Sequence, residues 1–243
     1  MFKRIPSLTE QIKAHLKQRI LNAEFEGGRI PPEMELAAEL NVSRSTIRDA
    51  LSRLETEGVI FRKQGAGTFV NATGLQVKVR LDEIWGYEAM LQAHGYNPSA
   101  EVVRVETQPP TAAMRSELNL TDNDEVVFVE KRFFANDEPV ILTCNYLPVK
   151  MFTAPYAKED FRLPLYEFLP RFCRQDLAYF FSEIVPYLAP DHVAMQLQLL
   201  PEKTALLAFE EIGFNQQNEP LLKSYSYFRD DVFRLRLIRR QLA

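Results

Sequence analysis

The chain has few of the residues that disulfide frameworks and metal centres need. Its 243 residues include two cysteines, three histidines and one tryptophan. Cys144 and Cys173 are too few for a disulfide framework, and we expect both to be free thiols. The histidines are far apart in the sequence and form no paired metal-ligand spacing. We therefore predict no metal site and no cofactor.

Long apolar runs are also missing. No run approaches the roughly 18 residues that a membrane helix needs, and the first residues lack the apolar stretch of a signal peptide. We expect a cytoplasmic protein with no membrane partner. With 46% hydrophobic and 26% charged residues, the composition is typical of a globular protein and not of a disordered tail. The length allows one large domain or two ordinary ones.

The chain has no overall excess of positive charge. Its net charge is −4, which by itself argues against a nucleic-acid partner. The first 70 residues, however, hold 11 lysines and arginines against 9 acidic residues, a net +2, so the remainder carries −6. Because the acidic excess lies wholly in the C-terminal part, the N-terminal part can still bind phosphate.

The N-terminal part predicts three helices followed by a β-hairpin. Apolar residues recur every four positions from residue 8, which indicates an amphipathic helix over 8–23. A Pro-Pro pair precedes a second helix over 33–40. The hydroxyl of Ser43 suits the N-cap of a third helix, which Gly58 ends. Strands at 59–63 and 68–71 are then predicted to pair around Gly65-Ala66-Gly67.

The third helix and the hairpin carry the residue types that DNA recognition uses. Arg44 and Arg48 are four residues apart and share a face that points away from the apolar stripe. A helix in the major groove needs such an edge, because arginine binds guanine or phosphate there. Two glycines would let the hairpin turn approach DNA closely. The predicted DNA-binding residues are Ser43, Arg44, Ser45, Thr46, Arg48, Arg62, Lys63, Gly65 and Gly67.

After residue 80 the pattern changes to that of an α+β domain around one antiparallel sheet. A helix is expected over 81–94, and shorter helices at 111–118, 159–170 and 190–199. We predict a winged helix-turn-helix domain at 1–72, a linker at 73–80 and an antiparallel-sheet domain at 81–243. Strand-like runs lie at 100–107, 125–135, 139–147, 175–185, 204–214, 220–229 and 232–239.

Three blocks in the N-terminal part resemble GntR-type bacterial transcription regulators. They are Ile30 to Ala37, Val42 to Gly58, and Gly65 to Val70. The resemblance implies a winged helix-turn-helix that binds a double-stranded DNA operator. Two departures stand out: the family often has a DNA-contacting arginine at Met34 and a lysine or arginine at Ala66. Losing two phosphate contacts should weaken DNA binding and flatten its salt dependence without abolishing it.

The C-terminal part resembles the HutC-like group of these regulators, whose effector domain, called UTRA, is similar in fold to chorismate lyase. The resemblance rests on blocks that span most of residues 75–240, and it implies an effector-binding and dimerisation domain. The blocks are Leu118 to Leu120, Val126 to Phe134, Ala135 to Val140, Asn145 to Pro148, Glu219-Pro220 and Phe228 to Asp231.

The same resemblance points to the effector site. Sugar-phosphate-sensing members usually have arginines where this chain has Lys131 and Phe133, and a glutamate where it has Thr143. Leu222 and Phe228 fall where a glutamate and a tyrosine are common. Such a pocket would leave the polar groups of a polyhydroxylated ligand unpaired, at about 1–3 kcal/mol each. We therefore predict a less polar effector, aromatic or aliphatic, with Lys131 holding a carboxylate.

No catalytic residue is predicted. The chain shows no Ser/His/Asp, Cys/His or close paired-carboxylate spacing on one element. Glu210-Glu211 and Asp230-Asp231 are adjacent pairs that point to opposite faces of a strand, and we interpret them as solvated rims. The aromatic residues 179–181, Trp85 and Tyr87 are interpreted as core or dimer interface and not as a ligand cage.

Together these features predict a dimeric, ligand-responsive transcription regulator, which in this group is most often a repressor. A two-fold dimer would bind a pseudo-palindromic operator. The effector would bind one relative arrangement of the two DNA-binding domains better than another, and it can shift DNA affinity only by that difference in binding. The alternative from another class is a small-molecule lyase or hydrolase with a vestigial DNA-binding module. A constitutive architectural DNA binder with an unused pocket is a third.

Overall fold

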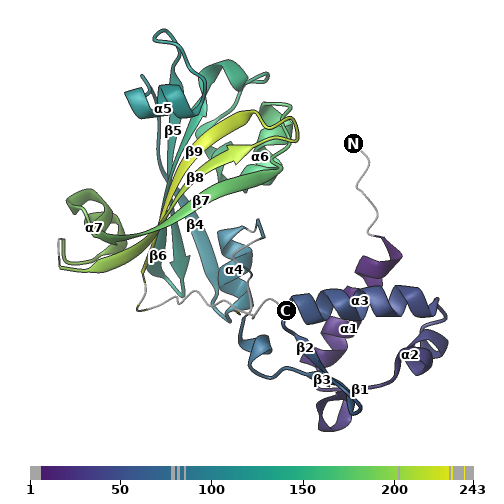
Figure 1. The fold of residues 1–243 in the computed structure, drawn as a ribbon. Helices are drawn as coiled ribbons and strands as arrows, with labels where there is room; N and C mark the ends of the chain where they lie inside the picture. Colours follow the sequence, from purple (N-terminus) through teal and green to yellow (C-terminus); the bar gives the residue numbers. More distant parts are fainter. Residues whose placement is uncertain are drawn as a thin grey trace. The chain divides into compact units, whose positions relative to one another are not determined.

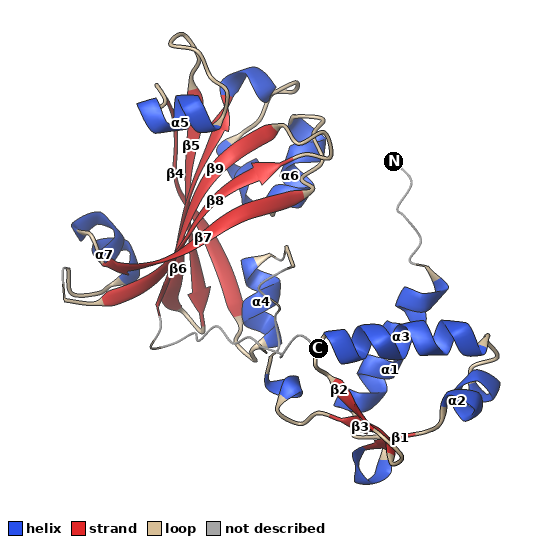
Figure 2. Ribbon diagram, viewed as in Figure 1, coloured by secondary structure: helices blue, strands red, loops and turns tan. Residues whose placement is uncertain are grey.

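The computed structural model describes residues 7–77, 80, 83–84, 86–201, 203–229, 231 and 238. They form two compact units, one within the first 80 residues together with residue 238, and the other within residues 81–235 (Figure 1). The first unit is mainly helical, and the second is built on one antiparallel sheet (Figure 2). The predicted α+β class, with a helix-turn-helix followed by a sheet domain, is confirmed.

The N-terminal unit folds as the local signals predict. The buried residues of α1, α2 and α3 form one apolar core, since each helix turns its apolar stripe inward. The short strand β1, which we did not predict, adds to the hairpin to give a three-stranded sheet in the order β1-β3-β2. Its elements are α1 (Leu8–Leu21), η1 (Glu26–Gly28), β1 (Arg29–Ile30), α2 (Glu33–Glu39), α3 (Arg44–Thr56), β2 (Ile60–Lys63), β3 (Gly67–Val70) and η2 (Gly74–Gln76).

The C-terminal unit contains a six-stranded antiparallel sheet in the order β4-β5-β6-β9-β8-β7. Strands that follow one another in the chain pair antiparallel, except that β6 pairs with β9, which inserts between β6 and β8. The described elements are α4 (Tyr87–Ala93), β4 (Pro98–Gln108), α5 (Ala112–Glu117), β5 (Val126–Ala135), β6 (Glu138–Pro148), η3 (Val149–Met151), η4 (Lys158–Arg162), α6 (Leu165–Phe172), β7 (Tyr179–Leu188), α7 (Asp191–Leu197), β8 (Ala205–Phe214) and β9 (Pro220–Arg229).

Helices cover both faces of this sheet. Aromatic residues of η4 and α6 pack on one face, against Val127 and Val129 of β5 and Leu222 of β9. On the other face, α7 packs against Leu142 of β6 and Leu206 of β8. Because side chains alternate along a strand, each strand contributes to both layers. The face under α6 is the one that holds the cavity described below.

Two predictions need correction. The predicted single helix over 159–170 is two elements, η4 and α6, because Pro164 stands between them. Proline disfavours the helical conformation of the preceding residue, and Leu163 is extended, with ψ of 145°. The helix predicted over 81–94 is observed only from Tyr87 to Ala93. The strand predicted over 232–239 lies outside the described residues, apart from residue 238, which is not in a strand.

In the described part of the chain, no helix is long and apolar enough to cross a membrane. The same residues contain no group of three or more histidine, cysteine or acidic side chains placed to hold a metal ion. Both cysteines are free, as predicted. Burial raises the pKa of the Cys144 thiol to about 12 and that of Cys173 to about 11, so both are unreactive near neutral pH.

Candidate DNA interface and effector cavity

The N-terminal end of α3 is built from small hydroxyl residues. The Oγ of Ser43 accepts the backbone N–H of Thr46 at 3.1 Å, which confirms the predicted N-cap. The hydroxyls of Ser45 and Thr46 each lie 2.8 Å from that Oγ. Short side chains allow close approach, and the positive end of the helix dipole favours an anion. This end of α3 therefore has the chemistry of a phosphate contact.

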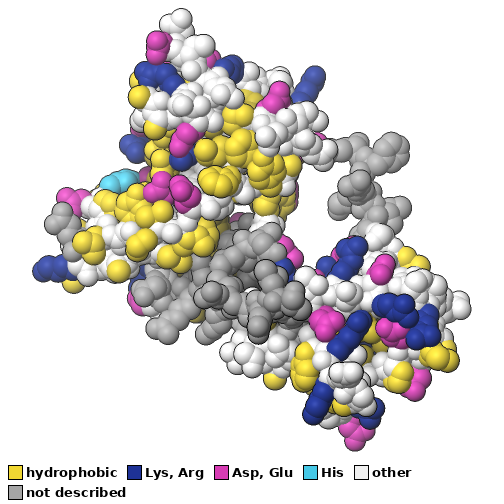
Figure 3. All heavy atoms as spheres, in the orientation of Figure 1, with side chains coloured by type: hydrophobic (Ala, Val, Ile, Leu, Met, Phe, Trp, Pro, Cys, Tyr) yellow, Lys and Arg dark blue, Asp and Glu magenta, His cyan; other side chains and the backbone are white. Residues whose placement is uncertain are grey.

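Arg44 and Arg48 lie side by side on α3 and share one acidic partner. Their side chains are 59% and 55% exposed. The Oε2 of Glu33, in the first turn of α2, accepts from Arg44 Nε at 3.3 Å and from Arg48 Nη2 at 3.2 Å. Burial acts to raise the pKa of Glu33, but the two arginines outweigh it and the net pKa is lowered. The carboxylate thus orients both guanidinium groups and offsets part of their charge. Basic side chains gather on the face of this unit seen in Figure 3.

The sequence did not reveal the role of Glu33, which lies 11 and 15 residues before its partners. Replacing Glu33 with glutamine is expected to strengthen binding to non-operator DNA about 3- to 10-fold and to steepen its salt dependence, because Arg44 and Arg48 lose an internal counter-charge. Discrimination between operator and non-operator DNA should fall. Fluorescence anisotropy titrations at several salt concentrations measure both quantities.

Glu35→Gln is the matched control for that experiment. Glu35 lies in the same turn of α2 and is exposed, and it forms no ion pair within the described residues. The Glu35→Gln substitution removes the same charge but leaves the ion pairs of Arg44 and Arg48 in place. An equal rise in affinity for both variants would assign the effect to net charge and contradict the positioning role of Glu33.

The β2–β3 hairpin carries two more basic side chains, those of Arg62 and Lys63. Arg62 Nε lies 3.4 Å from Oε2 of Glu55, and its backbone N–H donates to Oε1 of the same carboxylate at 3.3 Å. Lys63 is exposed and forms no ion pair with any residue that the structure describes. Gly65 and Gly67 have φ of +74° and +116°, where a side chain would strain the turn. The predicted glycine turn is thus present.

Arg29 is a residue near the wing that the sequence did not identify. The pairing of β1 with β3 sets Arg29 opposite Phe69, and its guanidinium lies 3.6 Å from where a Cβ on Gly67 would be. A two-residue strand is too short to show a readable pattern. Arg29 thus supplies a cation beside Gly67, the residue that follows Ala66 in the turn. Met34, the other departure, is exposed on α2.

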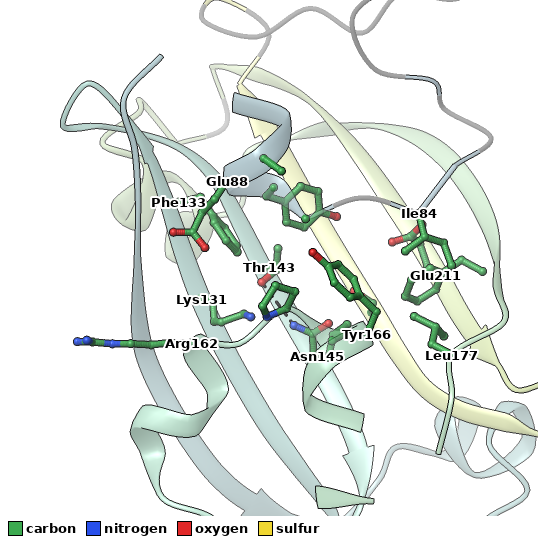
Figure 4. A pocket seen from close by; sticks show the side chains of 17 residues that line it. Ile84, Glu88, Lys131, Phe133, Thr143, Asn145, Arg162, Tyr166, Leu177 and Glu211 are labelled. Carbon is green, nitrogen blue, oxygen red and sulfur yellow. Dashed lines mark hydrogen bonds between the residues drawn. The ribbon is translucent and has the colours of Figure 1, made fainter. Parts of the chain in front are cut away.

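A cavity of about 240 Å³ lies on the face of the C-terminal sheet that α4 and α6 cover (Figure 4). Its volume is below the roughly 300–1,000 Å³ of common drug-sized pockets, which indicates a small ligand. Strands form the floor and helices form the opposite wall. The polar and aromatic side chains that line the cavity are Tyr87, Glu88, Lys131, Phe133, Thr143, Asn145, Arg162, Tyr166, Phe180, Glu211 and Ser224.

Lys131 is the buried cation of this cavity. It is 6% exposed, and its Nζ donates to the carbonyl oxygen of Leu163 at 3.2 Å. Within the described residues it forms no ion pair. Burial lowers its pKa to about 8, although the charge of Glu88 acts in the opposite direction. A buried ammonium with spare N–H donors is costly without an anion, so the site is suited to bind one.

The structure brings three of the five predicted effector residues together. Lys131, Phe133 and Thr143 line the cavity from β5 and β6. Leu222 and Phe228 lie on the same face of β9 as the lining residue Ser224, but neither lines the cavity. Leu222 is fully buried in the core, and the Phe228 ring packs 5.6 Å from that of Tyr87. Leu222 and Phe228 therefore pack next to residues of the cavity wall and do not line the cavity themselves.

The sequence reasoning missed Glu211. Glu210 and Glu211 point to opposite faces of β8, as expected, but the interpretation of Glu211 as part of a solvated rim was wrong. Glu211 lines the cavity, where burial raises its pKa, and accepts from the hydroxyl of Ser182 at 2.5 Å. Tyr87 and Phe180, which we had interpreted as core or dimer interface, also line the cavity. Only the strand register could show that these residues meet.

Comparisons with known proteins agree with both units. Residues 8–70 match the GntR family of bacterial regulatory proteins, and residues 93–234 match the UTRA domain. The regulator GmuR of Bacillus subtilis is 28% identical over 229 residues, which cover 92% of this chain and 94% of GmuR. The histidine utilization repressor of Pseudomonas putida is 29% identical over 203 residues, covering 81% and 76% of the two chains.

Solved structures show the same fold. YydK of Bacillus subtilis superposes with a TM-score of 0.75 at 18% identity, covering 96% of this chain and 99% of YydK. PhnF of Mycobacterium smegmatis gives 0.58 at 18% identity, covering 94% and 98%. The chain therefore belongs to the GntR family and carries a UTRA domain, as the HutC-like regulators do.

This membership makes the chain a ligand-responsive transcriptional regulator and not an enzyme. The lyase or hydrolase alternative is not supported, since the matched proteins are regulators. The N-terminal unit is the DNA-binding part, and the UTRA domain is the effector-binding part. The cavity on the sheet therefore is the candidate effector site.

Proposed function

We propose that this regulator is a repressor that binds a pseudo-palindromic operator as a homodimer and is controlled by a small carboxylate bound at Lys131. The observation that carries the effector class is the buried ammonium of Lys131, which faces a small cavity without an ion-pair partner among the described residues. Phe133, Leu165 and Phe180 supply apolar walls. A carboxylate with an apolar body satisfies both features.

On the DNA, Arg44 and Arg48 would reach base edges or phosphates of one half-site, and the end of α3 at Ser43 would hold a phosphate. Lys63 and the Gly65–Gly67 turn would contact the neighbouring backbone, with Arg62 beside them. Each of the two subunits would read one half-site, because a two-fold dimer imposes a two-fold operator. Such an operator would place the protein in the bacterial cytoplasm.

The apolar edge of the sheet supports self-association. Strand β7 is an edge strand, and its ten residues contain one charged side chain, Glu183. Edge strands are usually protected by several charges. Yellow, hydrophobic side chains gather over this region in Figure 3. Since Pro186 lacks an N–H, we propose contact mainly through side chains. The apolar edge consists of Tyr179, Phe181, Ile184 and Leu188, which are between 41% and 63% exposed.

The double variant Phe181→Asp, Ile184→Asp is expected to convert the dimer to a monomer. Operator affinity should then fall by about 100-fold or more, because the two DNA-binding domains are no longer linked and each must bind its half-site independently. Light scattering after size-exclusion chromatography measures the oligomeric state. Operator DNA selected from a random pool by the native protein should carry two inverted half-sites.

Glu183→Gln on the same strand is the control, and it should remain dimeric. The double variant should keep its far-UV circular dichroism spectrum, since both replaced side chains are exposed. A native protein that is monomeric at micromolar concentration, or a selected site with a single unrepeated element, would contradict the dimer proposal.

A further inference from the structure

A row of polar side chains crosses the floor of the cavity. In the register of the sheet, Lys131 of β5 lies opposite Thr143 of β6. Two residues further along β6, Asn145 lies opposite Ser224 of β9, which lies opposite Glu211 of β8. From β5 to β8 are three strand spacings, or about 14 Å between backbones. Lys131 and Glu211 therefore mark the two ends of one polar track (Figure 4).

The groups along this track have few partners. Ser224 is a buried residue that lines the cavity, and its hydroxyl forms no side-chain hydrogen bond within the described residues. In the part of the chain that the structure describes, the side-chain amide of Asn145 donates only to the hydroxyl of Thr143, at 3.4 Å. Glu211 accepts from Ser182, but no cation of the described residues pairs with it. Because buried polar groups are normally hydrogen-bonded, the track is prepared for a polar ligand along its whole length.

The charge of the cavity is unbalanced for a simple carboxylate. Among the described residues, four charged side chains line it, namely Lys131, Arg162, Glu88 and Glu211. Arg162 is exposed, and its guanidinium points away from the cavity in Figure 4. One cation and two carboxylates remain. A carboxylate effector would bring a third negative charge into a partly desolvated site, which is unfavourable unless a second positive charge accompanies it.

We propose that the effector is a small amino carboxylic acid, whose carboxylate binds Lys131 and whose ammonium group binds Glu211. The proposal rests on the proposed function, because it takes the carboxylate contact from it. Asn145 and Ser224 would bind the polar edge of the ligand between its ends. Tyr87, Phe133, Tyr166 and Phe180 would cover its carbon chain from the opposite wall and the sides. Glu211 is thus a specificity-determining residue for the amine.

Unbranched ω-amino acids and the alkanoates of equal chain length are suitable probes, with about four to seven carbon atoms to cover the span that remains after both side chains reach inward. Isothermal titration calorimetry on the full chain measures affinity. For at least one length, the amino acid should bind the native protein about tenfold or more tighter than its alkanoate, the equivalent of 1.4 kcal/mol. In Glu211→Gln that preference should disappear, while alkanoate affinity stays within about threefold or rises.

Glu125→Gln is the matched control, because Glu125 is exposed and lies in the turn before β5; it should keep the preference. If no amino acid binds the native protein better than its alkanoate, or if Glu211→Gln keeps the full preference, the inference is overturned. Alkanoate binding that disappears in Lys131→Met would then leave the proposed function standing. Alkanoate binding that ignores Lys131→Met would overturn the proposed function as well.

Discussion

Replacing Arg48 with alanine is expected to lower operator affinity about 10- to 100-fold at physiological salt, since a base or phosphate contact of this kind contributes roughly 1–3 kcal/mol. Arg48 projects from the exposed face of α3 beside Arg44. If it reads a base, the loss should be greater for operator than for non-operator DNA. If it binds phosphate, both should fall together and the salt slope should decrease by about one.

Arg53→Ala provides a closely matched control. Arg53 lies on the same helix and is 54% exposed, against 55% for Arg48. It belongs to the last turn of α3 and pairs with Glu10 of α1. We expect its replacement to change operator affinity less than threefold. Equal losses for the two variants, or no loss for Arg48→Ala, would overturn the assignment of α3 as the reading helix.

Lys131→Met is expected to abolish the response to carboxylate effectors. Methionine keeps most of the length of the side chain but cannot pair with an anion. Short alkanoates such as hexanoate should raise the melting temperature of the native protein and change its operator affinity, and both effects should be lost in the variant. Lys158→Met is the control, since the exposed Lys158 also donates to a main-chain carbonyl, that of Val103, at 3.0 Å.

The same variant should be more stable than the native protein. The folded pKa of Lys131, about 8, lies below its ordinary 10.5 because burial penalises the charged form. The native protein therefore bears a cost at neutral pH, of roughly 2–4 kcal/mol, that is relieved as pH rises from about 8 to 10.5. Chemical denaturation of both proteins at pH 7 and pH 10 should show the difference shrinking.

Effector affinity should show the opposite pH trend. A carboxylate binds only the charged form of Lys131, so affinity should fall about tenfold per pH unit above pH 8. Among the described residues, the charged or titratable groups that face Lys131 are Glu88 of α4 and Tyr166 of α6, since the guanidinium of Arg162 points away, and burial raises the pKa of Tyr166. Tyr166 therefore stays neutral in this range. A response that persists in Lys131→Met, or an affinity that does not change between pH 7 and pH 10, would place the effector elsewhere.

Much of the N-terminal unit could be predicted because its signals are local. Three features depend only on residues close by in the sequence. They are the apolar period of α1, the N-cap at Ser43 and the glycines of the hairpin. The ion pair of Glu33 with two arginines of α3 could not be predicted, because it depends on how α2 and α3 pack. The two-residue strand β1 was missed for the same reason, since only its pairing with β3 defines it.

The residues of the effector cavity likewise fall into those that the sequence identified and those that it did not. Lys131, Phe133 and Thr143 were identified because the motifs around the β5–β6 turn have counterparts in related regulators. Glu211 lies about 80 residues further along the chain, and it was misjudged because alternation shows which residues share a face but not which face is covered.

The sequence by itself determined the class of this protein, which is a regulator with two units in one chain. It also identified the arginines of α3. These features follow from helix period, capping and turn chemistry, which act over short stretches of chain. Only the tertiary structure decided that β9 inserts between β6 and β8. That insertion brings Asn145, Ser224 and Glu211 into one row with Lys131 at its end. Long-range strand pairing depends on burial of the whole sheet, so no local pattern could have placed the carboxylate of Glu211 in the cavity.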